Sequence, residues 1–324
     1  MEAVAVIGPG RIGRQIALAF ALGGCRVFLV DVKERPEEDA RRTFADARRE
    51  IARDLGLMVA EQVIDEEAAG AALARIEDRR GLTDDLQACG FIQEALPESV
   101  ELKRGFFRAL SGRVRDEAVI ASTSSSISPS HLADAVGGPG RFLVAHWLNP
   151  AHVIPLVEVV PSPLTLPATV ERTTAFLERL GKVPVRCGDS PGFIGPRLQV
   201  LLMNEAVRLV EEGVATPEEV DRAFRAGMGF RYASVGIFEF IDWGGVDILQ
   251  RAGRYLSEAL QDPRFLPPRS VEEKVERNEL GPKTGRGFYD YAGEARDRFE
   301  TEKMVALLRQ ARRRKEAQAP RVSG

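Results

Sequence analysis

The chain has 324 residues, of which 44% are hydrophobic and 29% charged, an ordinary balance for a globular protein with a sizeable core. At about 150 residues per domain, this length predicts two domains. The 45 Lys and Arg residues against 48 Asp and Glu residues give a net charge of -3, which argues against nucleic-acid and membrane-surface binding. No apolar run approaches the roughly 18 residues that a membrane-spanning helix needs.

Three cysteines are widely spaced along the chain: Cys25, Cys89 and Cys187. Their odd number and spacing exclude a disulfide scaffold and a cysteine-rich metal site, so we expect no metal. No basic residues precede the apolar stretch at 3–7, which therefore reads as a strand and not as a signal peptide. These features predict a cytoplasmic protein.

The first elements form a strand–helix–strand unit. Residues 3–7 are a continuous apolar run that ends in glycine, as in a strand buried on both faces. Apolar residues recur with helical spacing over 11–22, and 26–30 form a second strand closed by Asp31. Two parallel strands joined in this way need a right-handed crossover.

Residues 36–78 read as a charged helical hairpin inserted after the second strand, with Pro36 at its start. Strands then alternate with helices up to residue 187, a pattern typical of a doubly wound α/β sheet. We expect these strands near 90–92 and at 118–122, 142–145, 153–160 and 183–187, with a helix at 167–180.

Beyond 189–192 no convincing strand is predicted, and the periodicity becomes helical. The helical segments are 193–213, 217–227, 244–261 and 270–279. We therefore predict an α/β dinucleotide-binding domain at 1–188 and an all-α substrate and dimerisation domain at 189–293. A charged C-terminal helix and tail at 294–324 would follow, fraying over 319–324. Most apolar residues between Val235 and Trp243 are expected in the core of the helical domain.

A glycine-rich loop joins the first strand to the first helix. Gly8 permits a tight turn, Gly10 lets the backbone approach a pyrophosphate, and Gly13 allows close helix packing. The helix N-terminus, which begins with Arg11 and Ile12, offers N–H groups to the anion. Asp31 is placed to accept hydrogen bonds from the ribose hydroxyls and to repel a 2′-phosphate, so NAD is favoured over NADP.

His146 ends an apolar strand, at the edge where an open α/β sheet binds its ligands. Glu158 interrupts the next apolar run, and a buried carboxylate needs a partner. A pair between them would orient the imidazole as a general base; the alternative is a core histidine and a glutamate that caps a helix or pairs with arginine. We expect His131 to be structural or solvated, and His152, in the loop between strands, to be solvated.

Together with these features, several ordered motifs resemble the 3-hydroxyacyl-CoA dehydrogenase family, from Gly8 to Tyr291. The motifs are Gly8-Pro-Gly-Arg-Ile-Gly13 with Asp31, Glu94-Ala-Leu-Pro-Glu98 with Lys103, Ser122-Thr-Ser-Ser125, His146-Trp-Leu-Asn149-Pro150, Pro155-Leu-Val-Glu158, Asp189-Ser-Pro-Gly-Phe193 and Lys283-Thr-Gly-Arg-Gly-Phe-Tyr289. The resemblance implies a Rossmann-type domain, NAD as cofactor and a homodimer formed through the helical domain.

The resemblance also implies roles for individual residues. His146 would take the proton of the substrate 3-hydroxyl while C3 gives its hydride to the nicotinamide, and Glu158 would orient His146. Ser124 matches the family serine that hydrogen-bonds substrate, and Asn149 matches the asparagine after the histidine. The cofactor set further includes four residues, of which Glu94 and Lys103 match positions near the nicotinamide ribose: Glu94, Glu98, Lys103 and Ser122.

Two positions depart from the family pattern. Pro196 stands where the family usually has asparagine, and proline supplies neither the amide nor a backbone N–H. Ser122 likewise stands where asparagine is common. Several segments resemble the L-gulonate 3-dehydrogenases and lambda-crystallin, and among them Arg231 would suit a free carboxylate. Arginines of the inserted hairpin such as Arg49 could instead meet coenzyme A phosphates, although interleaved acids favour a solvated helix.

The leading hypothesis is an NAD-dependent dehydrogenase acting on the 3-hydroxyl of a short-chain 3-hydroxyacyl-CoA. The same chemistry on a free 3-hydroxy acid is the alternative. A non-catalytic, crystallin-like NAD-binding protein is more remote, since Ser124, His146 and Glu158 are all present. In each case the partner is a small molecule, not a nucleic acid or a membrane.

Overall fold

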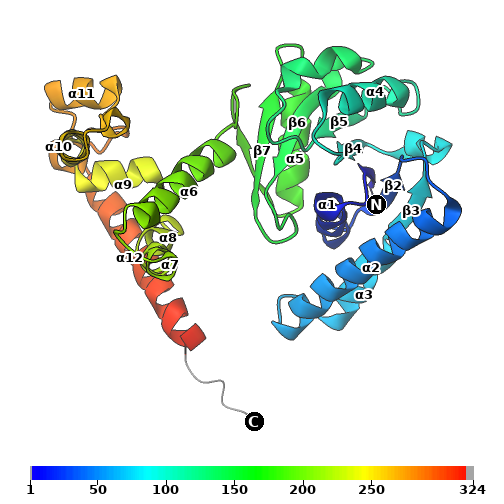
Figure 1. The fold of residues 1–324 in the computed structure, drawn as a ribbon, viewed down its shortest axis with the longest axis horizontal. Helices are drawn as coiled ribbons and strands as arrows, with labels where there is room; N and C mark the ends of the chain where they lie inside the picture. Colours follow the sequence, from blue (N-terminus) through cyan, green and yellow to red (C-terminus); the bar gives the residue numbers. More distant parts are fainter. Residues whose placement is uncertain (1, 319–324) are drawn as a thin grey trace, which may run out of the picture. The chain divides into compact units, whose positions relative to one another are not determined.

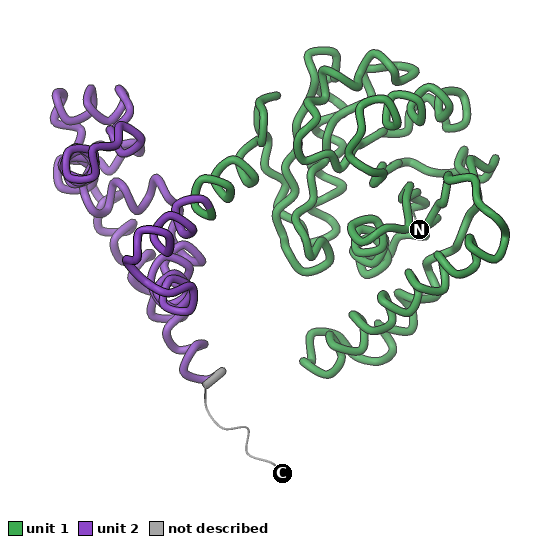
Figure 2. The backbone as a smooth tube through the Cα atoms, in the orientation of Figure 1, with its two compact units in different colours: residues 1–203 green, residues 204–324 purple. Residues whose placement is uncertain are grey.

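The computed structural model describes residues 2–318, which contain eight strands, twelve α-helices and six short 3₁₀ helices (Figure 1). The chain divides into two compact units, Met1–Met203 and Asn204–Gly324 (Figure 2). The predicted fraying of 319–324 lies outside the described residues.

All eight strands belong to one sheet in the order β3-β2-β1-β4-β5-β6-β7-β8. Every neighbouring pair is parallel except β6 and β7, which are antiparallel. The strands are β1 (Ala3–Ile7), β2 (Arg26–Asp31), β3 (Ile76–Arg80), β4 (Phe91–Glu94), β5 (Val119–Ser122), β6 (Phe142–Trp147), β7 (Leu156–Pro161) and β8 (Val183–Arg186).

Two apolar layers cover this sheet, and alternate residues of β1 serve both. Val4 and Val6 pack into the layer formed with α1, α2, α3 and α5, whereas Ala5 and Ile7 pack toward α4 and the 3₁₀ turns. The helices of this unit are α1 (Arg11–Leu22), α2 (Glu37–Ala60), α3 (Glu66–Ala74), α4 (Val100–Leu110) and α5 (Pro167–Arg179), with 3₁₀ helices η1 (Asp84–Ala88), η2 (Pro129–His131), η3 (Ala133–Ala135) and η4 (Pro139–Arg141). Helices on both faces confirm the predicted doubly wound sheet.

No strand occurs among the described residues after Arg186, apart from isolated bridges near 281–290. This confirms the predicted helical C-terminal domain. Its elements are α6 (Gly195–Glu211), which runs across the boundary at Met203, α7 (Pro217–Ala226), α8 (Met228–Tyr232), α9 (Ile237–Gly244), α10 (Val246–Ala259), η5 (Pro263–Phe265), α11 (Arg269–Glu276), η6 (Pro282–Thr284) and α12 (Ala295–Gln318).

The glycine motif at 283–289 has a structural role in the second unit. Asp242 is 1% exposed, and its carboxylate accepts hydrogen bonds from the backbone N–H groups of Phe288 and Tyr289 and from the Tyr291 hydroxyl. A Cβ on Gly287 would lie 2.3 Å from that carboxylate, so the loop can wrap it only with glycine there.

The structure corrects two expectations about secondary structure and one about burial. The predicted hairpin ends before residue 76, because Ile76–Arg80 forms β3. This edge strand is rich in charged side chains, so the sequence gives no alternating apolar pattern that would predict a strand. The short helices α8 and α9 also escaped prediction, since α8 has only 5 residues and α9 only 8. The apolar residues between Val235 and Trp243 are buried only in part: Val235 is 1% exposed and Phe240, Ile241 and Trp243 are half-buried, but Ile237 and Phe238 are 45% and 51% exposed.

Candidate active site

The carboxyl ends of the parallel strands β1, β2, β4, β5 and β6 lie along one edge of the sheet. The strand order reverses between β1 and β4, and ligands bind at such a switch point in open α/β sheets. The predicted site residues come from this edge: Asp31 ends β2, Glu94 ends β4, Ser122 ends β5, and His146 is the penultimate residue of β6.

The loop between β1 and α1 fits a pyrophosphate. Gly8 has φ +107°, and a Cβ there would lie 2.7 Å from the Ala95 carbonyl oxygen; one on Gly13 would lie 1.9 Å from the Gly8 carbonyl oxygen. Both positions therefore require glycine. A Cβ on Gly10 would meet no atom within 4 Å, so the space above the α1 N-terminus is open. No acidic residue lies in the first turn of α1, which leaves its positive end free for a phosphate.

A cavity of about 1050 Å³ extends from this loop. Its lining includes six of the predicted site residues: Gly8, Gly10, Arg11, Ile12, Asp31 and Asn149. Arg35 and Thr43, which the sequence reasoning missed, also line it, together with Leu102 and Phe106 of α4. The glycine loop, a carboxylate at the end of β2 and an apolar wall are the features that a dinucleotide site needs.

Asp31 is 5% exposed and accepts the backbone N–H of Lys33 at Oδ1 (3.1 Å). Its Oδ2 is buried and forms an ion pair with Arg35 Nε (2.9 Å) but accepts no hydrogen bond, so it can accept one from a donor on a ligand. A ribose hydroxyl of NAD is such a donor, so the residue fits the cofactor that the glycine loop indicates.

We expect Asp31→Ala to weaken NADH binding by about 10- to 100-fold, since a hydrogen bond to a charged group contributes about 1.5–3 kcal/mol. NADPH should lose far less, because the same change removes the charge that repels its 2′-phosphate. Quenching of protein fluorescence by each nucleotide measures both dissociation constants. Equal losses for the two would contradict the ribose role.

Glu94, Lys103 and Ser122 form a buried network behind the cavity. The Lys103 ammonium lies 2.7 Å from Glu94 Oε1, with both side chains 0% exposed, and Ser122 Oγ donates to Glu94 Oε2 (2.5 Å). The register of β4 and β5 causes this contact, because it places Glu94 directly beside Ser122. In this structure the three side chains satisfy one another and do not line the cavity.

Ser124 is bound to Glu98. The Glu98 Oε1 atom accepts hydrogen bonds from Ser124 Oγ (2.5 Å) and from the N–H and hydroxyl of Ser126 (both 2.9 Å). Burial opposes ionisation of Glu98, but these hydrogen bonds and Lys103 outweigh it and lower its pKa to about 2. Since Ser124 Oγ also accepts the N–H of Ile127, one lone pair is its remaining hydrogen-bonding capacity.

His146 and Glu158 are paired, as the sequence predicts. They face each other in the antiparallel β6–β7 ladder, with His146 Nδ1 2.7 Å from Glu158 Oε2. Glu158 Oε1 accepts the N–H groups of Ile194 (2.8 Å) and Gly195 (2.7 Å) at the start of α6. Burial raises the pKa of Glu158, but the hydrogen bonds from His146 and from these N–H groups prevail, and the pKa is lowered.

The paired carboxylate determines how the imidazole can act. An ionised Glu158 only accepts, so His146 Nδ1 holds the proton and Nε2 is free to take one from a substrate. The ring packs against Phe193 at 5.7 Å between centroids. Near the glycine loop, Asn149 Oδ1 accepts a hydrogen bond from Arg11 Nε (3.4 Å), which leaves its amide N–H groups available.

Other predicted residues lie apart from this edge. Arg49 is exposed on α2 and pairs with Asp46 at 2.7 Å, as expected of a solvated helix. Arg231 lies on α8 in the second unit, its guanidinium 3.9 Å from the Phe240 ring centroid. The prediction that His152 is solvated is wrong. Its side chain is 7% exposed and faces Asp54, because the loop after β6 packs under α2.

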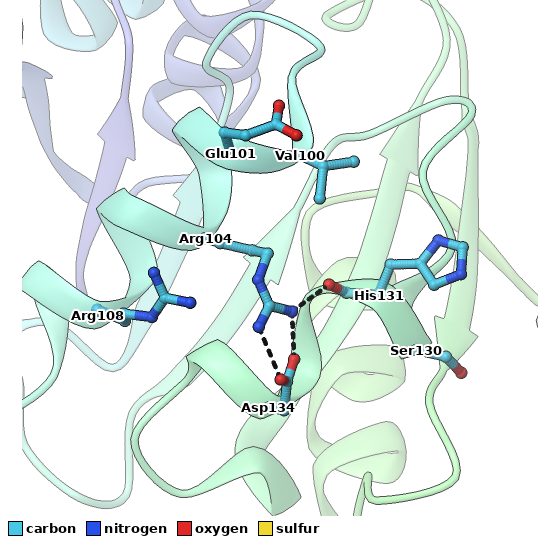
Figure 3. A pocket seen from close by; sticks show the side chains of 7 residues that line it. All are labelled: Val100, Glu101, Arg104, Arg108, Ser130, His131 and Asp134. Carbon is cyan, nitrogen blue, oxygen red and sulfur yellow. Dashed lines mark hydrogen bonds and ion pairs between the residues drawn. The ribbon is translucent and has the colours of Figure 1, made fainter.

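A second pocket, of about 620 Å³, lies between α4 and η2 (Figure 3). Arg104 spans it and donates to both carboxylate oxygens of Asp134 and to the His131 carbonyl. None of the predicted site residues lines this pocket. Arg104 is already neutralised by Asp134, so we assign the chemistry to the glycine-loop cavity and the neighbouring strand ends.

Residues 2–318 contain neither a candidate metal-ion site nor a membrane-spanning helix. No three His, Cys, Asp or Glu side chains are grouped so that they could hold a metal ion. No helix in this part of the chain is long and apolar enough to cross a membrane.

Comparison with known proteins identifies similar sequences over nearly the whole chain. Residues 3–190 match the family profile described as 3-hydroxyacyl-CoA dehydrogenase, NAD binding domain, and 192–291 match its C-terminal domain. A 3-hydroxybutyryl-CoA dehydrogenase of Bradyrhizobium diazoefficiens is 36% identical over 90% of this chain and 96% of its own. Lambda-crystallin of Oryctolagus cuniculus is 36% identical over 78% of this chain and 77% of its own. The crystal structure of a 3-hydroxyacyl-CoA dehydrogenase from Archaeoglobus fulgidus has a TM-score of 0.74 at 32% identity, covering 95% of this chain and 98% of that one.

Proposed function

Because this chain belongs to the 3-hydroxyacyl-CoA dehydrogenase family and is an NAD-dependent oxidoreductase acting on CH–OH groups, we propose a specific reaction for it. The enzyme oxidises the 3-hydroxyl of a short-chain 3-hydroxyacyl-CoA to the 3-oxoacyl-CoA, reversibly. The His146–Glu158 pair at 2.7 Å is the observation that supports this reaction.

In this proposal bound NAD supplies the nicotinamide ring that takes the hydride and its electron pair from C3. His146 Nε2 takes the hydroxyl proton, and Glu158 holds the ring in the required tautomer and stabilises the imidazolium that results. Asn149 and Ser124, which match polar positions of the family, contact the substrate oxygen or the nicotinamide. Gly10 and Asp31 hold the pyrophosphate and the adenosine ribose of the cofactor.

The test of substrate class compares acetoacetyl-CoA with free acetoacetate, following NADH consumption at 340 nm. We expect kcat/KM for the thioester to exceed that for the free acid by at least about 100-fold, since remote binding energy of the coenzyme A group adds to catalysis. Faster turnover of a free oxo acid would contradict an acyl-CoA substrate.

A free 3-hydroxy acid is the second candidate, and the charges on α2 favour it. All five arginines of this helix have acidic partners: Arg41 with Glu37, Arg42 with Asp39, Arg48 with Asp78, Arg49 with Asp46 and Arg53 with Glu50. Coenzyme A phosphates would have to displace those acids. If free acids are the better substrates, Arg231→Ala should raise their KM while leaving NADH binding unchanged.

We further propose a cytoplasmic homodimer formed through the helical domain. Apolar side chains of α10 support an interface, because Ile248, Tyr255 and Leu256 are 50%, 69% and 39% exposed at helical spacing. All three cysteines are free thiols, which suits a reducing compartment.

A further inference from the structure

The adenosine end of the cofactor cavity contains an arginine that the cofactor signature does not include. Arg35 follows β2, and its side chain lines the cavity beside Asp31 and Thr43. The guanidinium is fastened at one end, since Nη1 donates to Thr43 Oγ1 of α2 (3.0 Å). Nη2 reaches Asp31 Oδ1 at 3.5 Å.

The other end of the guanidinium is ion-paired but makes no directed hydrogen bond. Arg35 Nε forms an ion pair with Asp31 Oδ2 at 2.9 Å, and both atoms are buried without a hydrogen-bond partner. The ion pair therefore leaves one donor and one acceptor with unused hydrogen-bonding capacity in the wall of the cavity. Buried polar atoms in this state cost free energy until a ligand satisfies them.

A hydroxyl group fits this pair of atoms, because it donates one hydrogen bond and accepts others. We propose that Arg35 is a second ribose-binding residue: one adenosine-ribose hydroxyl of NAD donates to Asp31 Oδ2 and accepts from Arg35 Nε. Arg35 thereby sets cofactor specificity together with Asp31. A phosphate in place of the hydroxyl accepts from Arg35 but is repelled by Asp31.

The roles of the two residues are separable. Asp31 rejects a 2′-phosphate, whereas Arg35, with Lys33 also lining the cavity, attracts one. When Asp31 is replaced by alanine, Arg35 loses its anionic neighbour, and its full charge becomes available to a 2′-phosphate. Arg35 therefore contributes to any NADPH affinity that the Asp31→Ala variant gains.

The experiment measures NADH and NADPH dissociation constants by fluorescence, without substrate or turnover. The proteins are the wild type, Arg35→Ala, Arg35→Lys, Asp31→Ala and the Asp31→Ala/Arg35→Ala double variant. Arg42→Ala is the matched control, since this arginine lies on α2, is 75% exposed and does not line the cavity. Thermal unfolding of each variant checks that the fold is retained.

We expect Arg35→Ala to weaken NADH binding about tenfold, as for the loss of a hydrogen bond from a charged donor. Arg35→Lys should restore part of that loss. Arg42→Ala should change the NADH dissociation constant by less than twofold. NADPH should bind the double variant at least about tenfold more weakly than it binds Asp31→Ala. The proposal is overturned if Arg35→Ala binds NADH within twofold of the wild type, or if the double variant binds NADPH as well as Asp31→Ala does.

Discussion

Replacing His146 by alanine is expected to lower kcat by about 10²–10⁴-fold in either direction of the reaction, the usual contribution of a positioned general acid or base. The imidazole is the group at the end of β6 whose free Nε2 can exchange a proton with the substrate oxygen. Its partner Glu158 cannot replace it, because that carboxylate accepts three hydrogen bonds and is 0% exposed. Initial rates of acetoacetyl-CoA reduction at saturating NADH measure the loss.

Binding of NADH separates a catalytic from a structural role in this variant. His146 does not line the glycine-loop cavity, so the NADH dissociation constant should stay within about twofold of the wild-type value. His131→Ala is the matched control, since that histidine lies on η2 and lines the pocket of Figure 3 instead. Loss of NADH binding in His146→Ala would show that the histidine supports the fold and would remove it from the mechanism.

Glu158→Gln should depress kcat by about 10²–10⁴-fold as well, by misdirecting the imidazole. The carbonyl oxygen of the glutamine can keep the hydrogen bonds from Ile194 and Gly195, which turns its NH₂ group toward His146 Nδ1. That nitrogen must then accept, and the ring proton moves to Nε2, the atom that has to be free. The pKa of Glu158 is lowered, so the wild-type residue is ionised at neutral pH and the substitution removes a full charge.

Thermal unfolding separates orientation of the base from a structural role of Glu158. This carboxylate also accepts the N–H groups of Ile194 and Gly195 at the start of α6. We expect Glu158→Gln to unfold close to the wild-type temperature, because the glutamine carbonyl can keep both hydrogen bonds. A large loss of stability without a loss of kcat would make Glu158 a packing and helix-capping partner of α6 and not a group that orients the base.

The parts of the site that could be predicted are those in which backbone geometry restricts residue choice. Gly8 and Gly13 have no room for a Cβ, and such positions leave a fixed spacing in the sequence. The His146–Glu158 pair was also predictable. A buried carboxylate in an apolar strand requires a partner, and the two strands lie next to each other. Continuous apolar runs also predicted the central strands, because a strand that is buried on both faces carries apolar residues along its whole length.

The parts that could not be predicted depend on contacts between distant segments. Arg35 belongs to the cavity only because Thr43 of α2 and Asp31 of β2 hold it there. His152 is buried because the loop after β6 packs under α2 near Asp54. The edge strand β3 is rich in charge, so no hydrophobic period distinguishes it from the preceding helix.

Transfer of an isotopic label tests most directly that the enzyme moves a hydride from C3 while His146 takes the proton. The substrate is 3-hydroxybutyryl-CoA with deuterium at C3, incubated with NAD and the wild type or His146→Ala, and the reduced cofactor is analysed by mass spectrometry. We predict one deuterium in each reduced cofactor formed by the wild type and almost no reduced cofactor from the variant. Unlabelled NADH from the wild type, or equal rates for the two proteins, would contradict the proposed reaction.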